Sequence, residues 1–263
     1  MASLLISELD EMKKAYGTGR RTALENAGEI IIEEKKIEEE EVVFCLDRFG
    51  YAKILDVSVY EKNKEAADAD NKYVFRVMNT DKVCLFSDIG KMHTIKVLDV
   101  PRKKLREKGI PVDNLSNFET AREELLYAAP LAEVQKSELF FATEKGFVKR
   151  TGGAEFVSSV RTIQSTKLQE GDRLILVSPD DQLEFCVLMS HEGYFLKFAV
   201  SEASELKKTA VGVKGMALSG SDRIERAYLI GSAHEFSVDY RGGKVFMNRL
   251  KLAKRGGKGT KKK

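Results

Sequence analysis

Leu-Phe-Phe-Ala-Thr-Glu-Lys-Gly-Phe-Val-Lys-Arg, at residues 139–150, has the form of a β-hairpin. Its two apolar runs are rich in aromatic and β-branched residues, which favours strands, and each run is too short for a helix. The polar turn between them ends at Gly146, and glycine supplies the positive φ that closes such a turn. Two basic residues, Lys149 and Arg150, follow in the second strand.

This pattern occurs four more times, at residues 43–53, 83–91, 186–197 and 236–245. The turn glycines stand at positions 50, 90, 146, 193 and 243, so the repeats are 40, 56, 47 and 50 residues apart. Further strand-like runs lie between the hairpins, at residues 73–77, 125–129, 174–177 and 226–230. About four strands per unit at this period are typical of a blade, because one hairpin cannot bury its faces alone. The sequence therefore predicts an all-β, propeller-like disc of five four-stranded blades.

Three segments do not fit the repeat. Residues 3–16 carry apolar residues on one helical face before Gly17 and predict a short N-terminal helix. Residues 17–28 contain three glycines and little apolar material, which indicates a linker. Residues 102–108 follow Pro101 and predict a short helix between the second and third blades. We expect two parts, residues 1–28 and a blade domain over 29–263 with a basic tail from about residue 250.

The composition limits the class of protein. The chain has 263 residues, of which 43% are hydrophobic, so it can bury a core and is not typical of a disordered chain. Its longest apolar runs are far too short to cross a bilayer, and we expect no membrane contact. Cys45, Cys84 and Cys186 each lie in an apolar run. This indicates buried thiols in a reducing compartment, the cytoplasm.

The residues that commonly carry catalysis are sparse. The three histidines are far apart, which does not favour a zinc site or a His-based catalytic cluster. His93 and His191 lie at or near turns, and we expect both to be exposed. The sequence contains no phosphate-binding loop of the Walker type. We expect no catalytic residue, metal or cofactor in this chain.

The net charge of +3 hides an asymmetry. Residues 241–263 carry ten Lys or Arg and no acid, which leaves 34 basic and 41 acidic residues elsewhere, a net charge of −7. Much of the acid lies in residues 29–41. A polyanion would therefore have to bind the C-terminal segment and local clusters of basic residues, because the rest of the chain does not attract it.

Several motifs occur together in an order that is typical of one family. They are Gly-Phe-Val-Lys-Arg at 146–150, Leu-Gln-Glu-Gly-Asp at 168–172, Lys-Thr-Ala-Val-Gly-Val-Lys-Gly at 208–215, Gly-Ile-Pro-Val-Asp-Asn-Leu at 109–115, and Tyr-Gly at 16–17 before Arg-Arg-Thr at 20–22. In these motifs the chain resembles the C-terminal domain of the A-type polypeptide of bacterial type IIA topoisomerases, DNA gyrase and topoisomerase IV. The resemblance covers essentially the whole chain.

The resemblance implies a β-pinwheel, a disc of blades whose basic outer rim bends duplex DNA. It implies that residues 1–28 are the end of a helical arm and its linker. It also implies a non-catalytic part of an ATP-hydrolysing enzyme, because the family's nucleophilic tyrosine and ATPase lie elsewhere. The expected partners are double-stranded DNA, the rest of the A-type polypeptide and a B-type ATPase polypeptide, at the nucleoid in the cytoplasm.

One motif separates the two enzymes. Gyrase carries a Gln-Arg-Arg-Gly-Gly-Lys-Gly box in its first blade, which the family implies is needed to wrap DNA. The matching place here, residues 61–68 after Tyr60, reads Glu-Lys-Asn-Lys-Glu-Ala-Ala-Asp. A near copy, Ala-Lys-Arg-Gly-Gly-Lys-Gly, occurs instead at residues 253–259. The absence of the box from the first blade favours a topoisomerase IV-like parent over gyrase.

Twelve basic residues are candidates for DNA contact. Basic residues after each hairpin would recur at equivalent positions, face one edge of the disc and form a track along the phosphates. The twelve are Lys53, Lys96, Lys149, Arg150, Arg161, Lys197, Lys208, Lys214, Arg249, Lys254, Arg255 and Lys258. Tyr51, Phe147 and Tyr194 at the hairpin returns are predicted to pack within the blades.

A second hypothesis remains open. Blade folds often serve as platforms for other proteins, and the net negative charge outside the C-terminal segment favours a protein-docking scaffold with incidental nucleic-acid contact. A lysine after a single turn is also typical of ordinary solvated surface.

Overall fold

The structure, a computed structural model, describes residues 2–19, 22, 38–181, 183–233 and 235–262. The chain divides into two compact units, residues 1–38 and 39–263. In the first unit, helix α1 (Ala2–Tyr16) confirms the predicted N-terminal helix. The expected boundary at residue 29 and most of the expected linker lie outside the described residues. No helix within the described ranges is long and apolar enough to span a membrane.

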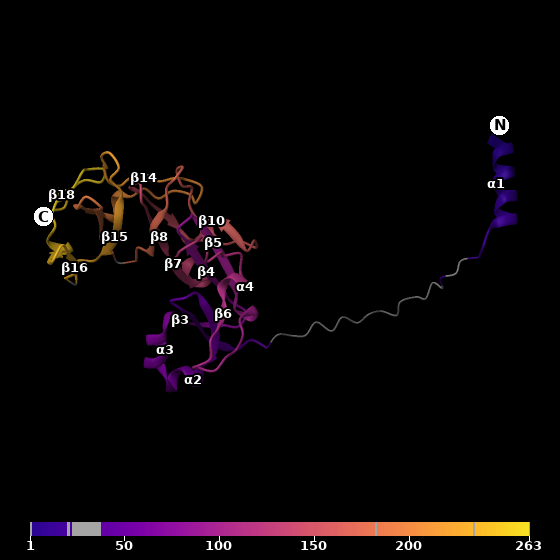
Figure 1. The fold of residues 1–263 in the computed structure, drawn as a ribbon, viewed down its shortest axis with the longest axis horizontal. Coiled ribbons are helices and arrows are strands. Elements are labelled where there is room, and N and C mark those ends of the chain that lie inside the picture. Colours follow the sequence, from indigo (N-terminus) through magenta and orange to yellow (C-terminus); the bar gives the residue numbers. More distant parts are fainter. Residues whose placement is uncertain (1, 20–21, 23–37, 182, 234, 263) are drawn as a thin grey trace. The chain divides into compact units, whose positions relative to one another are not determined.

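Five antiparallel hairpins form the second unit (Figure 1). They are β1 (Glu41–Asp47) with β2 (Tyr51–Asp56), β4 (Lys82–Ser87) with β5 (Lys91–Lys96), β8 (Glu138–Thr143) with β9 (Phe147–Gly152), β12 (Phe185–Ser190) with β13 (Tyr194–Ala199), and β16 (Ser237–Tyr240) with β17 (Gly243–Phe246). The five predicted hairpins are confirmed. In the first four, the turn glycine has a φ between 76° and 88°. In the fifth, Arg241 and Gly242 have positive φ, so Gly243 is the first residue of β17 and not the turn glycine.

A third strand pairs with the first strand of four hairpins. These strands are β3 (Asn71–Met78), β7 (Leu125–Pro130), β11 (Leu174–Pro179) and β15 (Ile224–Ile230), and they confirm the four predicted strands between the hairpins. Strands β3, β7, β11 and β15 contact one another in this order. They therefore form the inner side of the blades.

A short fourth strand lies on the outer side of each of these four sheets. The outer strands are β6 (Ile110–Pro111), β10 (Thr162–Gln164), β14 (Val213–Lys214) and β18 (Thr260–Lys261), paired with β2, β5, β9 and β13. Each outer strand follows the hairpin of the next sheet in the sequence. The chain therefore crosses back along the perimeter to complete the preceding sheet.

We name the sheets blades A to E in chain order. Blades A to D each have four strands, with the orders β3-β1-β2-β6, β7-β4-β5-β10, β11-β8-β9-β14 and β15-β12-β13-β18. Blade E consists of β16 and β17 alone within the described part of the chain. Five units are thus present, but the prediction of four strands in each is wrong for the last.

Short helices connect the strands. They are α2 (Val57–Lys62), α3 (Lys64–Asp70), α4 (Val112–Leu115) and α5 (Leu131–Val134), with 3-10 turns η1 (Val97–Asp99), η2 (Gly153–Phe156), η3 (Val200–Glu202) and η4 (Met247–Arg249). The helix predicted over residues 102–108 is absent from the structure, which describes this segment fully. Residues 101–103 are extended, because Ile54 donates its N–H to the Pro101 carbonyl and accepts a bond from Lys103, and residues 105–107 form a turn.

The core lies between consecutive blades. Phe44 of blade A packs in one cluster with Leu85 of blade B, and Phe86 of blade B meets Phe141 of blade C in another. Because both faces of a hairpin are covered, its strands are buried continuously and not alternately. The three cysteines are buried, as predicted.

The two histidines that lie near turns in the sequence differ in their exposure. His191 is exposed, as predicted. His93 is fully buried, so its predicted exposure is wrong. Its Nε2 lies 2.8 Å from a carboxylate oxygen of Glu123, and its Nδ1 lies 3.1 Å from the hydroxyl of Thr162 in β10. Desolvation lowers the pKa of His93, although the neighbouring Glu123 carboxylate acts in the opposite direction.

Candidate nucleic-acid interface

Three crossover loops on the perimeter share one construction. Loop A (residues 102–110), loop C (205–213) and loop D (252–260) each begin with a parallel bridge to the second strand of a hairpin and end at the first residue of an outer strand. The bridged pairs are Ile54 with Arg102, Arg150 with Glu205, and Lys197 with Leu252. In all three loops the outer strand begins eight residues after the bridge. The loops are therefore structural equivalents despite their different sequences.

A glycine closes each loop against the strand beneath it. A Cβ atom at Gly109 would lie 2.3 Å from the carbonyl oxygen of Ala52, and one at Gly259 would lie 2.5 Å from that of Phe195. At Gly212 the corresponding distance to the carbonyl oxygen of Val148 is 2.8 Å. Only glycine permits this approach of loop to strand.

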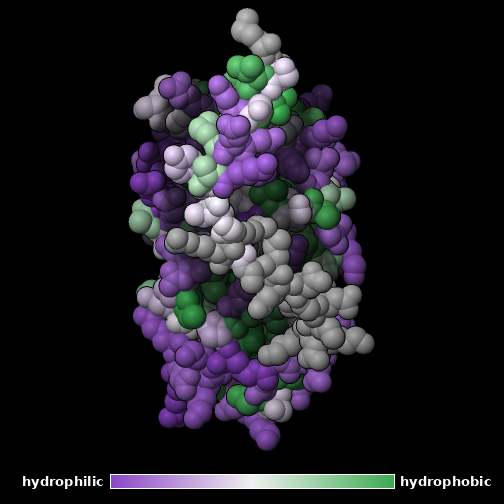
Figure 2. Space-filling model, turned by 90° about the vertical axis from the view of Figure 1, so that its right-hand side faces the viewer, coloured by the Kyte–Doolittle hydropathy of each residue, from purple (hydrophilic) through white to green (hydrophobic). Residues whose placement is uncertain are grey.

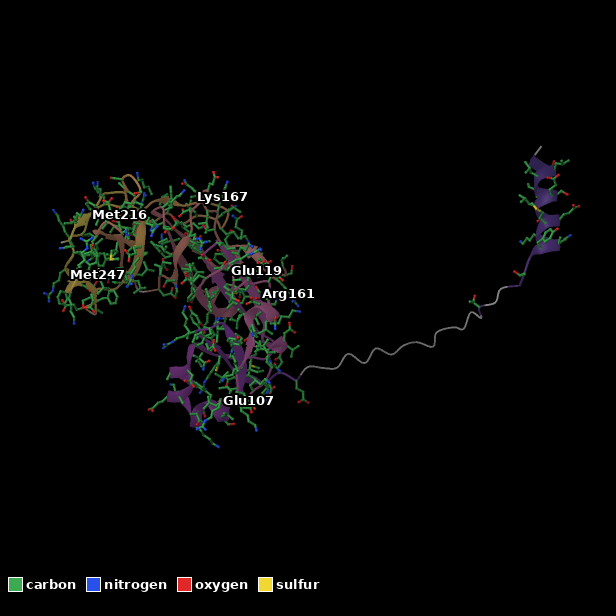
Figure 3. The ribbon with its side chains drawn as sticks, in the orientation of Figure 1. Glu107, Glu119, Arg161, Lys167, Met216 and Met247 are labelled. Atoms are coloured by element: carbon green, nitrogen blue, oxygen red, sulfur yellow. The ribbon has the colours of Figure 1, made fainter. Side chains whose placement is uncertain are left out.

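The loops carry many basic side chains on their outer side. Loop A has five Lys or Arg, loop C has two and loop D has three, against the two acids Glu107 and Glu205. The exposed bases of the loops and of the outer strands that follow them are Arg102, Lys103, Lys104, Arg106, Lys108, Lys207, Lys214, Lys254, Lys258 and Lys261. Figure 3 shows Arg161, directly before β10, and Lys167, shortly after it, near the edge of the body. The perimeter loops are therefore basic, with ten Lys or Arg against two acids.

Few carboxylates oppose these bases. Arg102 forms ion pairs with Glu40 and, at 2.7 Å, with Asp56. Among the described residues, no carboxylate lies within ion-pair distance of Lys103, Lys104 or Lys207. Figure 2 shows hydrophilic residues over most of one face, with hydrophobic residues in small separate patches. The loop lysines therefore remain available to an external anion.

Aromatic residues at the hairpin returns lie beneath some of these lysines. The Nζ of Lys108 is 3.7 Å from the ring centroid of Tyr51. The Nζ atoms of Lys258 and Lys261 are 4.8 and 5.2 Å from the ring centroid of Tyr194. Cation–π attraction of this kind restrains a lysine without neutralising its charge. Tyr194 packs against a buried cluster, as predicted, whereas Tyr51 is half-buried beneath Lys108.

The segment that resembles the gyrase box is part of loop D. Arg255 donates its backbone N–H to the Glu202 carboxylate at 2.9 Å and its Nε–H to the Glu202 carbonyl at 2.8 Å. Gly256 donates its N–H to the Gly215 carbonyl at 2.7 Å. These bonds attach residues 253–259 to blades C and D, on the perimeter.

The crossover to blade B differs from the other three. Arg161 accepts a bond from the Thr94 N–H and is followed directly by β10, so no eight-residue loop forms. Arg161 lies 3.8 Å from the Asp99 carboxylate. Val157 and Val160 on this crossover are exposed. Blade B therefore presents fewer free bases than loops A and D.

The predicted site residues fall into two groups. Lys53, Lys149 and Lys197 are buried, with 8%, 1% and 8% of their surface exposed, so the prediction that they face outward is wrong. Lys53 and Lys149 stand three residues after the turn glycine, whereas Lys197 stands four after it. Neighbouring positions in a strand face opposite sides of the sheet, so the three are not equivalent.

The other nine predicted residues lie on or near the surface. Lys96, Arg161, Lys214, Lys254 and Lys258 are exposed, and Arg255 and Lys208 are half-buried. Arg150 forms an ion pair with Glu138 at 2.8 Å, and Arg249 forms one with Glu235 at 2.7 Å.

Sequence reasoning misses the basic residues of loop A. Lys103, Lys104, Arg106 and Lys108 are exposed, and together they form the densest group of bases on the perimeter. Their clustering in the sequence is a usable signal, but the helix predicted there hides it. Lys207 in loop C is exposed, and no local signal in the sequence singles it out.

Comparison with known proteins identifies the repeat. The family model described as the DNA gyrase C-terminal domain, beta-propeller, matches residues 137–179 and 184–230, which run from hairpin to inner strand in blades C and D. The chain resembles the C-terminal domain of the type IIA topoisomerase A-type polypeptide, as the sequence predicts. The gyrase A polypeptide of Lawsonia intracellularis is 28% identical over 96% of this chain, and that of Staphylococcus epidermidis is 29% identical over 99%.

Solved structures of type IIA topoisomerase C-terminal domains share the fold. The C-terminal domain of DNA topoisomerase IV superimposes with a TM-score of 0.76 at 24% identity, over 86% of this chain and 73% of that one. The E. coli ParC C-terminal domain gives 0.67 at 16% identity, over 85% of this chain and 94% of that one. The β-pinwheel prediction is thereby confirmed. The chain spans about a third of the length of the curated gyrase A relatives it matches, 33% and 31% for the two named above.

Proposed function

We propose that this domain binds duplex DNA along its perimeter and bends it, as a non-catalytic part of the A-type polypeptide of a type IIA topoisomerase. The observation that carries the proposal is the set of crossover loops A, C and D, which project basic side chains from structurally equivalent places on three of the blades. Contacts of this kind neutralise phosphates and read little sequence. We therefore expect low sequence specificity and a preference for DNA that bends easily.

The structure sets the scale of the salt dependence. Nine exposed bases lie in or directly after loops A, C and D without a described acidic partner: Lys103, Lys104, Arg106, Lys108, Lys207, Lys214, Lys254, Lys258 and Lys261. If roughly five to eight phosphates are neutralised, log K falls with log salt at a slope of about −4 to −7. A slope near zero would mean that the loop bases do not meet phosphates.

The parent enzyme is proposed to be topoisomerase IV-like. Residues 61–68, where gyrase carries its box, lie on α2 and α3 with exposed Glu61 and Glu65. The box-like segment 253–259 instead belongs to the perimeter of blade D. A topoisomerase IV-like parent relaxes plasmid DNA with ATP but introduces no negative supercoils. Negative supercoiling of relaxed plasmid by the complete enzyme would contradict this assignment.

The proposed partners follow from the relatives. The relatives named above are gyrase A polypeptides, and this chain covers about a third of their length. We propose that the rest of an A-type polypeptide and a B-type ATPase polypeptide complete the enzyme, in the cytoplasm. Co-purification of the tagged chromosomal A-type polypeptide with a B-type polypeptide tests this.

A binding and bending assay tests the central proposal. The domain is mixed with a duplex of about 40 base pairs carrying fluorophores at both ends, at low salt where phosphate binding is strongest. Binding with a rise in energy transfer, lost when Lys103, Lys104, Arg106 and Lys108 are all changed to Gln, supports the proposal. If wild type neither shifts nor bends the duplex, the protein-docking hypothesis becomes the better account.

A further inference from the structure

Loops A and C are held from the inside by buried lysines. The Nζ of Lys53 donates to the carbonyl oxygens of Leu105 at 2.5 Å and Glu107 at 2.9 Å, both in loop A. The Nζ of Lys149 donates to three carbonyls of loop C, those of Lys207 at 3.1 Å, Lys208 at 3.3 Å and Ala210 at 3.1 Å. Both lysines stand three residues after the turn glycine, at the same position of their blades.

These hydrogen bonds satisfy both the buried ammonium groups and the loop carbonyls. An ammonium group has three donors and no acceptor, and a buried charge is unfavourable unless it is hydrogen-bonded. The loop backbones leave several carbonyls without strand partners, and buried carbonyls need donors. Lys149, with 1% of its surface exposed, supplies three donors to loop C. The lysine and the loop therefore satisfy each other.

The direction of the carbonyls decides what the loops present to solvent. Where successive carbonyls converge on one buried nitrogen, the chain is wrapped around that nitrogen. Lys207, whose carbonyl binds Lys149, has an exposed side chain, and so do Lys104 and Arg106, which flank Leu105 in loop A. The buried ammonium thus fixes the backbone from which the exposed bases project.

Loop D provides an internal comparison. It has the same length and the same closing glycine, but Leu196 stands where blades A and C have a lysine. Loop D is held instead by Arg255 on Glu202 and by Gly256 on Gly215. A buried lysine is therefore one of two ways in which this fold fixes a perimeter loop.

We propose that Lys53 and Lys149 are positioning residues for DNA binding: they touch no phosphate, but they hold loops A and C in the conformation that presents the basic side chains to the duplex. The inference rests on the proposed function. A loop that is already ordered loses less conformational entropy on binding, so the buried lysine raises affinity through residues other than itself.

Lys149→Met and Lys207→Met in the full chain form a matched pair. Each removes one positive charge, Lys149→Met from inside loop C and Lys207→Met from its exposed side. The measurements are amide hydrogen exchange over residues 205–213, and affinity for a duplex of about 40 base pairs at several salt concentrations. We expect Lys207→Met to lower affinity about two- to fourfold and the salt slope by about 0.9, with unchanged exchange. We expect Lys149→Met to accelerate exchange in loop C and to lower affinity about tenfold or more.

Two further variants secure the test. Lys53→Met is expected to act on loop A as Lys149→Met acts on loop C. Lys149→Arg, which keeps a cationic donor, is expected to restore part of the affinity. Wild-type affinity in a folded Lys149→Met variant overturns the inference. Loss of the whole fold in both Lys53→Met and Lys149→Met also overturns it, because the two lysines would then not act on their loops specifically. If wild type binds no DNA, the proposed function fails, and the exchange data alone decide whether Lys149 holds loop C.

Discussion

Substituting the closing glycine of loop D tests how the perimeter is built. Gly259 has a φ of +78°, and a Cβ there would lie 2.5 Å from the Phe195 carbonyl oxygen. The left-handed conformation costs a non-glycine residue roughly 1–2 kcal/mol. The overlap must also be relieved by moving the loop, and we expect about 3 kcal/mol in total for Gly259→Ala.

Gly256→Ala is the matched control in the same loop. Gly256 has nearly the same φ, +82°, but its nearest neighbour to an added Cβ is the Lys214 carbonyl oxygen at 3.6 Å, an ordinary contact. Only the conformational cost of roughly 1–2 kcal/mol applies there. The difference between the two variants therefore isolates the close approach.

Strand β18 is expected to separate from β13 in the Gly259→Ala variant. It is joined to β13 through the pairs Tyr194 with Lys261 and Phe195 with Thr260, and each net hydrogen bond stabilises by about 1 kcal/mol. A penalty of about 3 kcal/mol exceeds that pairing, so β18 separates while blade D stays folded. Faster amide exchange at residues 260–262 and weaker DNA binding in Gly259→Ala, but not in Gly256→Ala, are expected. Equal exchange and equal thermal midpoints in the two variants would refute the reasoning.

Three other outcomes are expected. Burial lowers the pKa of the Lys149 ammonium from 10.5 to about 8. Between these two pH values the unfolded chain keeps a proton that the folded chain has released, so the free energy of unfolding of wild type rises with pH, by at most about 3 kcal/mol. Chemical denaturation of Lys149→Met from pH 7 to 10.5 should lack this rise. Desolvation raises the pKa of Cys45 to about 11 and of Cys84 to about 12; a thiol reagent at pH 8 should therefore label them only after denaturation, and rapid labelling of native protein would contradict their burial. Lys104→Gln should weaken DNA binding about equally for unrelated duplex sequences and lower the salt slope by about 0.9; a sequence-dependent loss would indicate base contact instead.

The hairpins could be predicted because their signals are local. Gly146 and the apolar runs beside it lie within twelve residues, and the left-handed conformation at the turn demands glycine. The inner strands are equally visible, since β7 and β15 are continuous runs of six or seven residues rich in apolar side chains. The blade fold follows from the repetition of these two features.

The outer strands could not be predicted in the same way. β6 and β14 have two residues each, which is too short for any periodicity. Loop A is fixed by the bridge from Arg102 to Ile54, which lies 48 positions earlier in the chain. A segment placed by such distant contacts resembles a helix or a loop when only its own residues are considered.

The roles of the basic residues depend on equally distant contacts. Residue type alone places Lys149 on the surface, because a buried lysine is rare unless its charge is bonded. The carbonyl of Ala210 that binds it comes from 61 positions later in the sequence. Only the crossover topology brings the two together, and the same topology exposes Lys207 two residues after the bridge at Glu205.

That topology also orders the events of biosynthesis. Strand β2 ends at Asp56, yet its outer partner β6 begins at Ile110, after the hairpin of blade B has been made. At a ribosomal rate of roughly 5–20 residues per second, the outer edge of β2 stays unpaired for about 3–10 seconds. Every nascent sheet through blade D passes through this interval, with backbone donors open to neighbouring polypeptides. Chain termination within blade E would leave its predecessor permanently in that aggregation-prone state.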